Sequence, residues 1–248
     1  MGRWKYQPAA DLELPLAERL RRFPREPDLT VYALRSAAAL VLRGWLKLYH
    51  RLEIVGREHL PLDRSFVLVA NHASHLDTLA LLAALPLRKL HRAFPAAAQD
   101  YFFVNIPRLA MAAIVVNALP FGRQTHVRHS LDLCRALLSN PGNILVLFPE
   151  GTRTTTGEIG EFKAGISLLV AGTDIPVVPC HLAGAFEAWP KGSLIPRPHR
   201  LRLRIGTPQT FEKFPPGKES AGHIGEQLRS SVMALGEQTR QSSAPRDQ

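Results

Sequence analysis

Two histidines and an aspartate interrupt an apolar stretch of the sequence. The segment reads NHASHLD, from Asn71 to Asp77, with continuous apolar runs on both sides. On an unbroken helix His72 and Asp77 would lie about 140° apart, so they meet only where a strand end, a turn and a helix start follow one another. Ser74 is then expected at the helix N-cap, with Asp77 at the capping-box position.

His72 and Asp77 have the residue types of a general base and its orienting carboxylate. A carboxylate that binds one imidazole nitrogen leaves the other free to take a proton from a hydroxyl. Metal ligation by His72, His75 and Asp77 is disfavoured, because the H-E-x-x-H spacing and a second ligand cluster are missing. A cap alone leaves Asn71 and His72 unexplained, and a serine hydrolase would need a G-x-S-x-G turn, which is absent.

A second polar cluster follows another apolar run, ILVLF, at Phe148 to Arg153. Functional groups of open α/β sheets gather at the carboxyl ends of the strands. Glu150 can accept from a hydroxyl, Gly151 allows close backbone approach, and Arg153 can bind a phosphate through two nitrogens. An ordinary solvated turn is the alternative, but two such strand ends in one domain favour a site.

A third stretch, residues 116 to 130, places Arg123 between an expected strand and the next expected helix, with Arg128 nearby. Arginines and helix N-termini both favour anions, although a solvated basic loop explains the same pattern. Neither a Walker A nor a G-x-G-x-x-G motif is present, so nucleotide sites of those types are not expected.

The order of apolar runs predicts an α/β fold, a largely parallel mixed sheet flanked by helices. Strands are expected at 52–55, 66–70, 91–97, 114–118, 144–148, 175–180 and 200–206, the last with one wet face. Helices are expected at 75–85, 99–112, 126–139 and 163–171, with Gly172 as the residue after a helix end. Residues 216–248 are expected to form a final helix at 219–236 and a disordered tail.

Residues 28–50 are predicted to form an N-terminal amphipathic helix that begins at Asp28, after a leader or linker at 1–27. Arg43, Lys47 and His50 are expected opposite an apolar face, with Arg35 at its edge. That pattern is typical of a helix lying on a membrane surface, and equally of one packed on the domain. The apolar face is expected to hold Val31, Leu34, Ala38, Val41, Leu42, Trp45, Leu48 and Tyr49.

The chain of 248 residues carries a net charge of +10 and is 46% hydrophobic. Its length and composition suit one globular domain with extensions. The charge favours a polyanionic partner, namely an anionic membrane, a phosphorylated substrate or nucleic acid. A GC-rich genome, which favours arginine codons, would also produce such a charge. Cys134 and Cys180 both stand in apolar contexts, which predicts buried free thiols.

Taken together, these motifs resemble the lysophosphatidic acid acyltransferase (PlsC-type) family of glycerolipid acyltransferases. The family pattern N-H-x-x-x-x-D is met at Asn71 to Asp77, and F-P-E-G-T-R at Phe148 to Arg153. V-G-x-E-x-L-P precedes them at 55–61, and F-K-x-G and I-P-V-V-P stand at 162–165 and 175–179. The resemblance therefore covers about residues 50–212 and assigns 51–215 to the acyltransferase domain. The second motif departs, because Gly122 replaces the usual aspartate before Arg123.

The resemblance implies transfer of an acyl group from acyl-CoA or acyl-carrier protein to the sn-2 hydroxyl of lysophosphatidic acid, without metal or other cofactor. His72 would be the base and Asp77 its orienting group, at the cytoplasmic face of an anionic membrane as a peripheral enzyme. Another lyso-lipid acceptor is the alternative that Gly122 motivates. A non-catalytic basic protein on membranes or nucleic acid is more remote, and no nucleic-acid partner is expected. The acceptor head would be held by Arg123, Glu150, Gly151, Thr152, Arg153 and Lys163.

Overall fold

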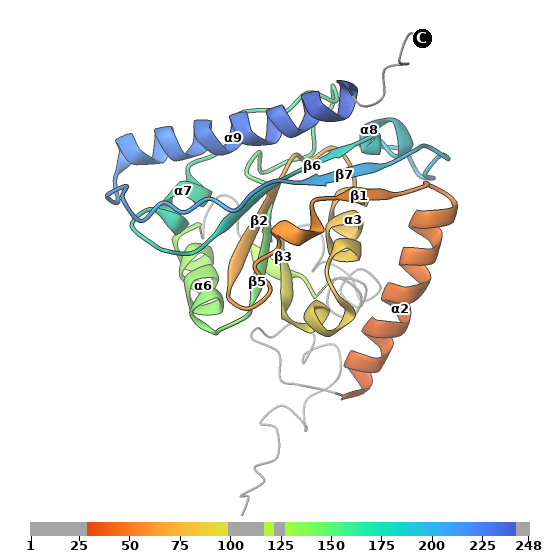
Figure 1. Ribbon diagram of the computed structural model, residues 1–248, viewed down its shortest axis with the longest axis horizontal. Helices are drawn as coiled ribbons and strands as arrows, with labels where there is room; N and C mark the ends of the chain where they lie inside the picture. Colours follow the sequence, from red (N-terminus) through yellow and green to blue (C-terminus); the bar gives the residue numbers. More distant parts are fainter. Residues whose placement is uncertain (1–28, 99–116, 122–126, 242–248) are drawn as a thin grey trace, which may run out of the picture.

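A mixed sheet organises the residues that the computed structural model describes, 29–98, 117–121 and 127–241 (Figure 1). Within these ranges its order is β1-β7-β6-β2-β5-β3-β4, and every neighbouring pair is parallel except β6 with β7. The predicted largely parallel mixed sheet is therefore confirmed. The strands are β1 (Glu53–Val55), β2 (Phe66–Ala70), β3 (Ala93–Ala98), β4 (Leu119–Phe121), β5 (Ile144–Leu147), β6 (Val177–Ala183) and β7 (Arg202–Ile205).

The central strands are apolar throughout because both faces of the sheet are covered. In β2, Phe66, Leu68 and Ala70 join the core under α2 (Leu29–Leu48) and α3 (Leu76–Ala84). Val67 and Val69 point into a second core. That core is closed by α6 (Val127–Ser139), α7 (Gly165–Val170) and α9 (Lys218–Gln241). Burial alternates along β7, the strand expected to have one wet face.

Shorter elements complete the frame. The 3-10 helices η1 (Arg57–His59) and η2 (Leu87–Arg92) precede β2 and β3, and α8 (Ala185–Ala188) follows β6. Figure 1 shows α6 and α7 at one end of the molecule and α2 at the other, with α9 running along β6. Gly172 has a φ of 72° after the end of α7, as its predicted place after a helix end requires.

The expected strand at 114–118 is wrong where it can be checked. Asn117 and Ala118 lie outside any strand, and β4 begins only at Leu119. Asn117 takes a left-handed φ of 56°, and its side-chain amide donates to the carbonyls of His91 and Ala93. This bend turns the chain before the strand can start. The helix expected at 99–112, the leader and Asp28 lie outside the described residues.

The C-terminal helix is longer than predicted, since α9 continues to Gln241 through part of the expected disordered tail. The Thr239 hydroxyl donates to the Leu235 carbonyl, and Gly236 lies against the ring of His181. Any side chain at Gly236 would collide with that ring. Packing of α9 against β6 thus keeps this polar C-terminal segment helical.

The predicted cationic face of α2 is wrong in its orientation. Only Lys47 is exposed, whereas Arg35 and His50 are buried and Arg43 is half-buried. Arg35 donates to the Asn117 side-chain oxygen at 3.1 Å, and Arg43 donates to the Leu85 carbonyl at the end of α3. The inner side of α2 therefore includes two arginines, each hydrogen-bonded to the domain. Large apolar side chains of the predicted apolar face turn outwards, namely Leu34, Val41 and Leu48, joined by Leu29 and Leu40.

Candidate active site

The site forms where β2 and β5 end side by side. Their register pairs Val69 with Leu147, so the segments beginning at Asn71 and Phe148 leave the sheet at the same edge. The Asn71 amide donates to the Leu182 carbonyl at 3.1 Å and accepts from the Leu182 N–H at 2.9 Å. Asn71 thus prolongs the β2–β6 pairing by one side chain and fixes where the turn begins.

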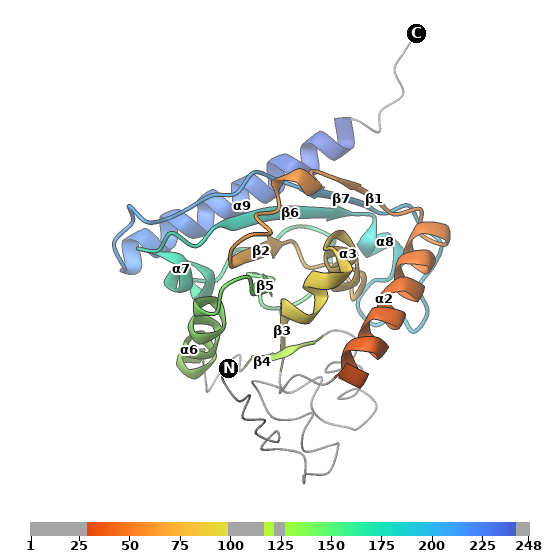
Figure 2. The same ribbon diagram turned by 60° about the horizontal axis from the view of Figure 1, so that its bottom comes forward.

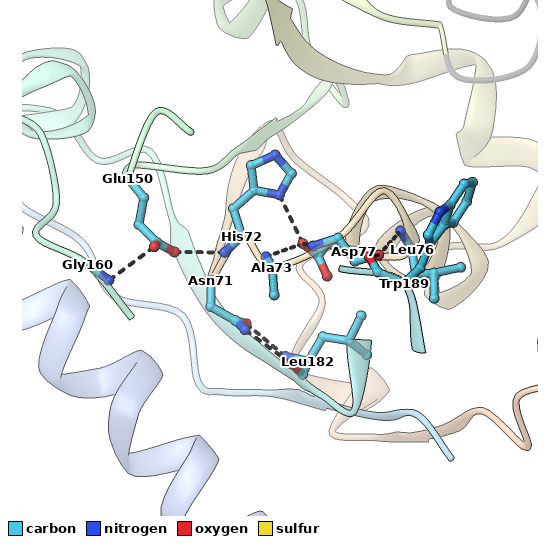
Figure 3. Close-up of polar contacts among 10 residues, drawn as sticks. Asn71, His72, Ala73, Leu76, Asp77, Glu150, Gly160, Leu182 and Trp189 are labelled. Carbon is cyan, nitrogen blue, oxygen red and sulfur yellow. Dashed lines mark hydrogen bonds and ion pairs between the residues drawn. The ribbon is translucent and has the colours of Figure 1, made fainter. Parts of the chain in front are cut away.

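The turn brings His72 and Asp77 together, as predicted (Figure 3). Asp77 Oδ2 lies 2.9 Å from His72 Nδ1 and also accepts the main-chain N–H groups of Ala73 and Ser74 at 2.7 and 2.8 Å. Asp77 is fully buried, whereas the His72 side chain retains 15% exposure. A proton held on Nδ1 by the carboxylate leaves Nε2 as the basic nitrogen.

The predicted capping box is only half formed. Asp77 reaches back to the Ser74 N–H, but the N-cap position is His75 and α3 begins at Leu76. The Ser74 hydroxyl accepts from the Leu76 N–H at 3.2 Å and donates to the Trp189 carbonyl at 2.8 Å. Ser74 therefore joins the turn between His72 and Asp77 to the segment after α8, because its hydroxyl donates to the Trp189 carbonyl.

The second strand end supports the first. The Phe148 ring stacks on the His72 ring, with centroids 4.1 Å apart and 15° between the planes. Glu150 is buried; its Oε1 accepts the His72 N–H at 2.7 Å and its Oε2 accepts the Gly160 N–H at 3.0 Å. The Thr154 N–H donates to the His72 carbonyl at 2.8 Å. The main chain of His72 is thus held on both sides by the loop after β5.

Glu150 was expected to meet the acceptor, but both of its oxygens already bind main-chain N–H groups. Burial raises the pKa of Glu150, while the bonds from Gly160 and His72 act in the opposite direction. Two N–H donors require an acceptor on each oxygen, which the carboxylate supplies. In the structure Glu150 therefore holds the main chain of His72 and of Gly160.

The remaining predicted anion-binding residues lie along the same loop. Gly151 has a φ of 73°, and the Lys163 side chain folds over it so closely that a Cβ would stand 2.8 Å from Nζ. Thr152 is exposed and Arg153 half-buried. Within the described ranges neither Arg153 nor Lys163 has an ion-pair partner, so both charges are available to a ligand. Arg123 and Gly122 lie outside the described residues.

His75, which no chemistry required, packs against the Trp189 ring at a centroid distance of 5.4 Å. Burial lowers the pKa of His75 to about 4, with smaller contributions from the charges of Arg153 and His72. A neutral His75 suits a packing role. Trp189 and the Asn71–Leu182 bonds were not predicted as parts of the site; a tryptophan just before Pro190, shortly after the apolar 175–179 motif, was the available signal for Trp189.

Metal ligation finds no support in the part of the chain that the structure covers, where no three His, Cys, Asp or Glu side chains gather in a way that could hold an ion. Among the helices of those residues, none combines the length and the hydropathy that a membrane span requires. The site can accept a proton at His72 Nε2, and the positive charges of Arg153 and Lys163 lie on the adjoining loop.

Comparison with known proteins agrees with this geometry. The chloroplastic 1-acyl-sn-glycerol-3-phosphate acyltransferase LPAT1 of Arabidopsis thaliana is 34% identical over 149 residues, 58% of this chain and 39% of that protein. The mouse 1-acyl-sn-glycerol-3-phosphate acyltransferase alpha is 26% identical over 189 residues, 75% of this chain and 63% of that protein. The chain thus spans less than two thirds of the length of these relatives.

The fold has a solved counterpart. The crystal structure of the 1-acyl-sn-glycerophosphate acyltransferase PlsC of Thermotoga maritima matches with a TM-score of 0.62 at 24% identity, covering 87% of this chain and 81% of that one. A family model described as Acyltransferase matches residues 51–183, which include both strand ends of the site. More than half of the chain is therefore matched, and the chain belongs to the Acyltransferase family.

Proposed function

We propose that this chain transfers a fatty acyl group from an acyl-CoA or acyl-carrier-protein thioester to the sn-2 hydroxyl of lysophosphatidic acid, giving phosphatidic acid. The observation that carries the proposal is the 2.9 Å contact of His72 Nδ1 with the buried Asp77 carboxylate. Both residues lie inside the family match, and the relatives reported above are named for this reaction.

In the proposed step the acceptor hydroxyl attacks the thioester carbonyl carbon while its proton passes to His72 Nε2. A C–O bond forms, the C–S bond breaks, and the departing thiolate takes the proton from the His72 imidazolium, which restores the neutral base. The Asp77 carboxylate stabilises the imidazolium that exists between these transfers. The groups named and the thioester account for every proton and electron pair in the step.

The acceptor phosphate would be bound by the cations of the loop after β5. Arg153 and Lys163 carry uncompensated charge beside the turn that holds His72, and Thr152 offers a hydroxyl donor. The Gly151 N–H already donates to the Phe148 carbonyl at 3.0 Å, so Gly151 would contribute close main-chain approach rather than a donor. Arg123 remains a sequence-based prediction for the same role. A phosphate monoester is the head group that suits this charge best.

The test is an acyl-transfer assay with His72→Ala and, as a matched control, His223→Ala on the exposed side of α9. We expect the first to lose turnover by roughly a hundredfold to ten-thousandfold and the second to keep it. Lysophosphatidic acid, a lysophospholipid with a larger head and a lyso-aminolipid are compared with both donor types. Near-normal turnover of His72→Ala would overturn the mechanism. If the enzyme prefers a head group without a phosphate monoester, lysophosphatidic acid is not its acceptor, and the alternative lyso-lipid acceptor that Gly122 motivates takes its place.

For Arg153→Ala we expect a raised apparent KM for lysophosphatidic acid with a smaller effect on kcat, because a phosphate contact made in both ground and transition states is lost. Lysophospholipids with larger heads should respond less. An unchanged dependence on acceptor concentration would remove Arg153 from the phosphate site.

We also propose that the enzyme sits peripherally on an anionic membrane through α2. Its outward side exposes Leu34, Val41 and Leu48, the last at 82%, while Lys47 and Arg51 stand exposed at its C-terminal end. Apolar side chains beside cations are what the boundary of an anionic bilayer accommodates.

Sedimentation with phosphatidylglycerol vesicles tests this proposed membrane binding through α2. The triple variant Leu34→Ser, Val41→Ser, Leu48→Ser should release the protein, whereas Met233→Ser, which removes an exposed apolar side chain on α9, should not. Unfolding curves must first show that both variants fold. Equal sedimentation of the triple variant and the wild type would refute the seat.

A further inference from the structure

A second exposed apolar feature lies outside the motifs of the candidate site. The loop of residues 190–198, between α8 and β7, exposes Leu194 at 92% and Ile195 at 73%. These are large side chains next to each other in sequence, both pointing away from the domain. A lone exposed leucine needs no explanation, but an adjacent pair at the tip of a surface loop does.

The loop is built to hold that tip in place. The Ser193 N–H donates to the Pro190 carbonyl at 3.1 Å, and its carbonyl accepts the Trp189 indole N–H at 2.9 Å. The Ser193 hydroxyl donates to the Ile195 carbonyl, and the Arg197 N–H donates to the Ala188 carbonyl at 2.7 Å. Since these polar groups are satisfied within the loop, its apolar tip is presented on a formed turn.

The loop lies against the C-terminal end of α2, as Figure 2 shows. The Tyr49 hydroxyl donates to the Pro196 carbonyl at 3.1 Å, and the Leu201 N–H donates to the His50 carbonyl at 3.0 Å. Leu48, the neighbour of Tyr49, is itself largely exposed. The tip and the outward side of α2 therefore flank one corner of the molecule.

The charge around the tip is positive. Lys191 and Arg197 flank it and are exposed, and no Asp or Glu occurs from residue 188 to 211. The nearby Glu53 is already bound by Arg200 and Arg202. An apolar pair between cations matches the acyl boundary and the head groups of an anionic bilayer. The surface of these two side chains is far smaller than the roughly 1,000 Å² that a stable protein interface buries, and this disfavours a protein partner.

The base of the loop touches the catalytic turn. The Trp189 carbonyl accepts the Ser74 hydroxyl at 2.8 Å, and its ring packs on His75. Ser74 is two residues from His72, and its N–H binds the same Asp77 oxygen as His72 does. A loop seated on lipid would therefore fix the catalytic turn relative to the surface from which a lipid acceptor comes.

We propose that Leu194 and Ile195 insert into the head-group boundary of an anionic bilayer and form, with α2, a two-point membrane contact. This inference rests on the peripheral membrane seat proposed above. It assigns a second anchor to the segment between α8 and β7, and it connects that anchor to the turn holding His72.

The first test uses the full chain with Leu194→Cys carrying a polarity-sensitive fluorophore, because Cys134 and Cys180 are fully buried. With vesicles of phosphatidylglycerol and phosphatidylcholine we expect a blue shift, and quenching by lipids that carry a quencher in the acyl region. Val41→Cys reports on α2, and Lys213→Cys, in the exposed connection from β7 to α9, is the matched negative control.

The outcomes separate the two proposals. A shift at positions 41 and 194 but not at 213 supports the two-point contact. A shift at 41 alone overturns the loop anchor and leaves the α2 seat standing, whereas no shift at either position overturns both.

A second measurement removes the apolar tip without a label. Leu194→Ser with Ile195→Ser should weaken vesicle binding by roughly tenfold for each side chain withdrawn from lipid. Lys213→Ser serves as the control, and an unchanged unfolding midpoint shows that the turn still forms. Vesicle affinity equal to that of the wild type in a folded variant would overturn the inference.

Discussion

Replacing Asp77 by asparagine isolates the charge of the catalytic pair from its geometry. Asp77 Oδ2 accepts three N–H groups, whereas the buried Oδ1 has no hydrogen-bond partner among the described residues. The asparagine carbonyl oxygen can take the place of Oδ2 and keep all three bonds. The amide nitrogen then stands where Oδ1 stood, so Asp77→Asn preserves the imidazole tautomer and removes only the negative charge.

The expected loss follows from electrostatics. Two unit charges about 4 Å apart attract by about 4 kcal/mol at an effective dielectric constant near 20. If half or more of that attraction is realised when His72 becomes an imidazolium, transition-state stabilisation falls by about 2–4 kcal/mol. The rate constant should then fall by roughly 30- to 1,000-fold. Burying an amide nitrogen without a partner should also cost about 1–3 kcal/mol of stability.

The assay is initial-rate thiol release from an acyl thioester in the presence of lysophosphatidic acid, for Asp77→Asn, His72→Ala and the double variant. Because Asp77 acts through His72, the double variant should be no slower than His72→Ala alone. An Asp77→Asn rate within about threefold of the wild type would refute the electrostatic argument. Additive losses in the double variant would show that Asp77 acts on something other than the imidazole.

Three further changes test the supporting structure. Glu150→Gln sets an amide donor against a main-chain N–H, so we expect about 2–4 kcal/mol of lost stability in denaturant titrations, and lower kcat because His72 is no longer held. Gly151→Ala should lower both stability and acceptor affinity, measured by thermal melts and KM, because φ is positive and the Lys163 side chain occupies the space of a Cβ. Burial, with the Arg240 charge, lowers the pKa of His181 to about 4, so its contribution to stability is present above about pH 6.5 and falls towards pH 4, by about 3 kcal/mol in all. His181→Gln should flatten that acid slope, and an unchanged slope in unfolding curves would contradict it.

The strand ends of the site were predictable because they depend on local patterns. Continuous apolar runs identify strands buried on both faces, and the polar residues that end such runs must gather at one edge of a parallel sheet. The turn between His72 and Asp77 followed from helix geometry alone. The role of Glu150 did not, because its donor, the His72 N–H, stands opposite it only through the β2–β5 register.

The misplaced elements have a common cause in contacts distant in sequence. Residues 114–118 carry a strand-like composition, yet Asn117 bends the chain by bonding the main chain near β3. Residues 237–241 carry a disordered composition, yet they stay helical because α9 lies along β6 and β7. Local composition indicates a strand in the first case and disorder in the second, and in both cases contacts with distant parts of the chain decide where the element begins or ends.

The orientation of α2 shows most clearly what periodicity leaves open. A helical pattern separates apolar from cationic residues around the axis, but it does not say which side meets the protein. Here Arg35 and Arg43 turn inwards because carbonyl oxygens of the domain accept hydrogen bonds from their guanidinium groups. Arg43 donates to the Leu85 carbonyl and Arg57 to that of Ala83, at 3.3 Å, so two guanidinium groups complete the C-terminal end of α3. Leu34, Val41 and Leu48 are then left outside by the same rotation, so the stabilisation of α3 and the exposure of the proposed membrane-facing side are two results of one packing choice.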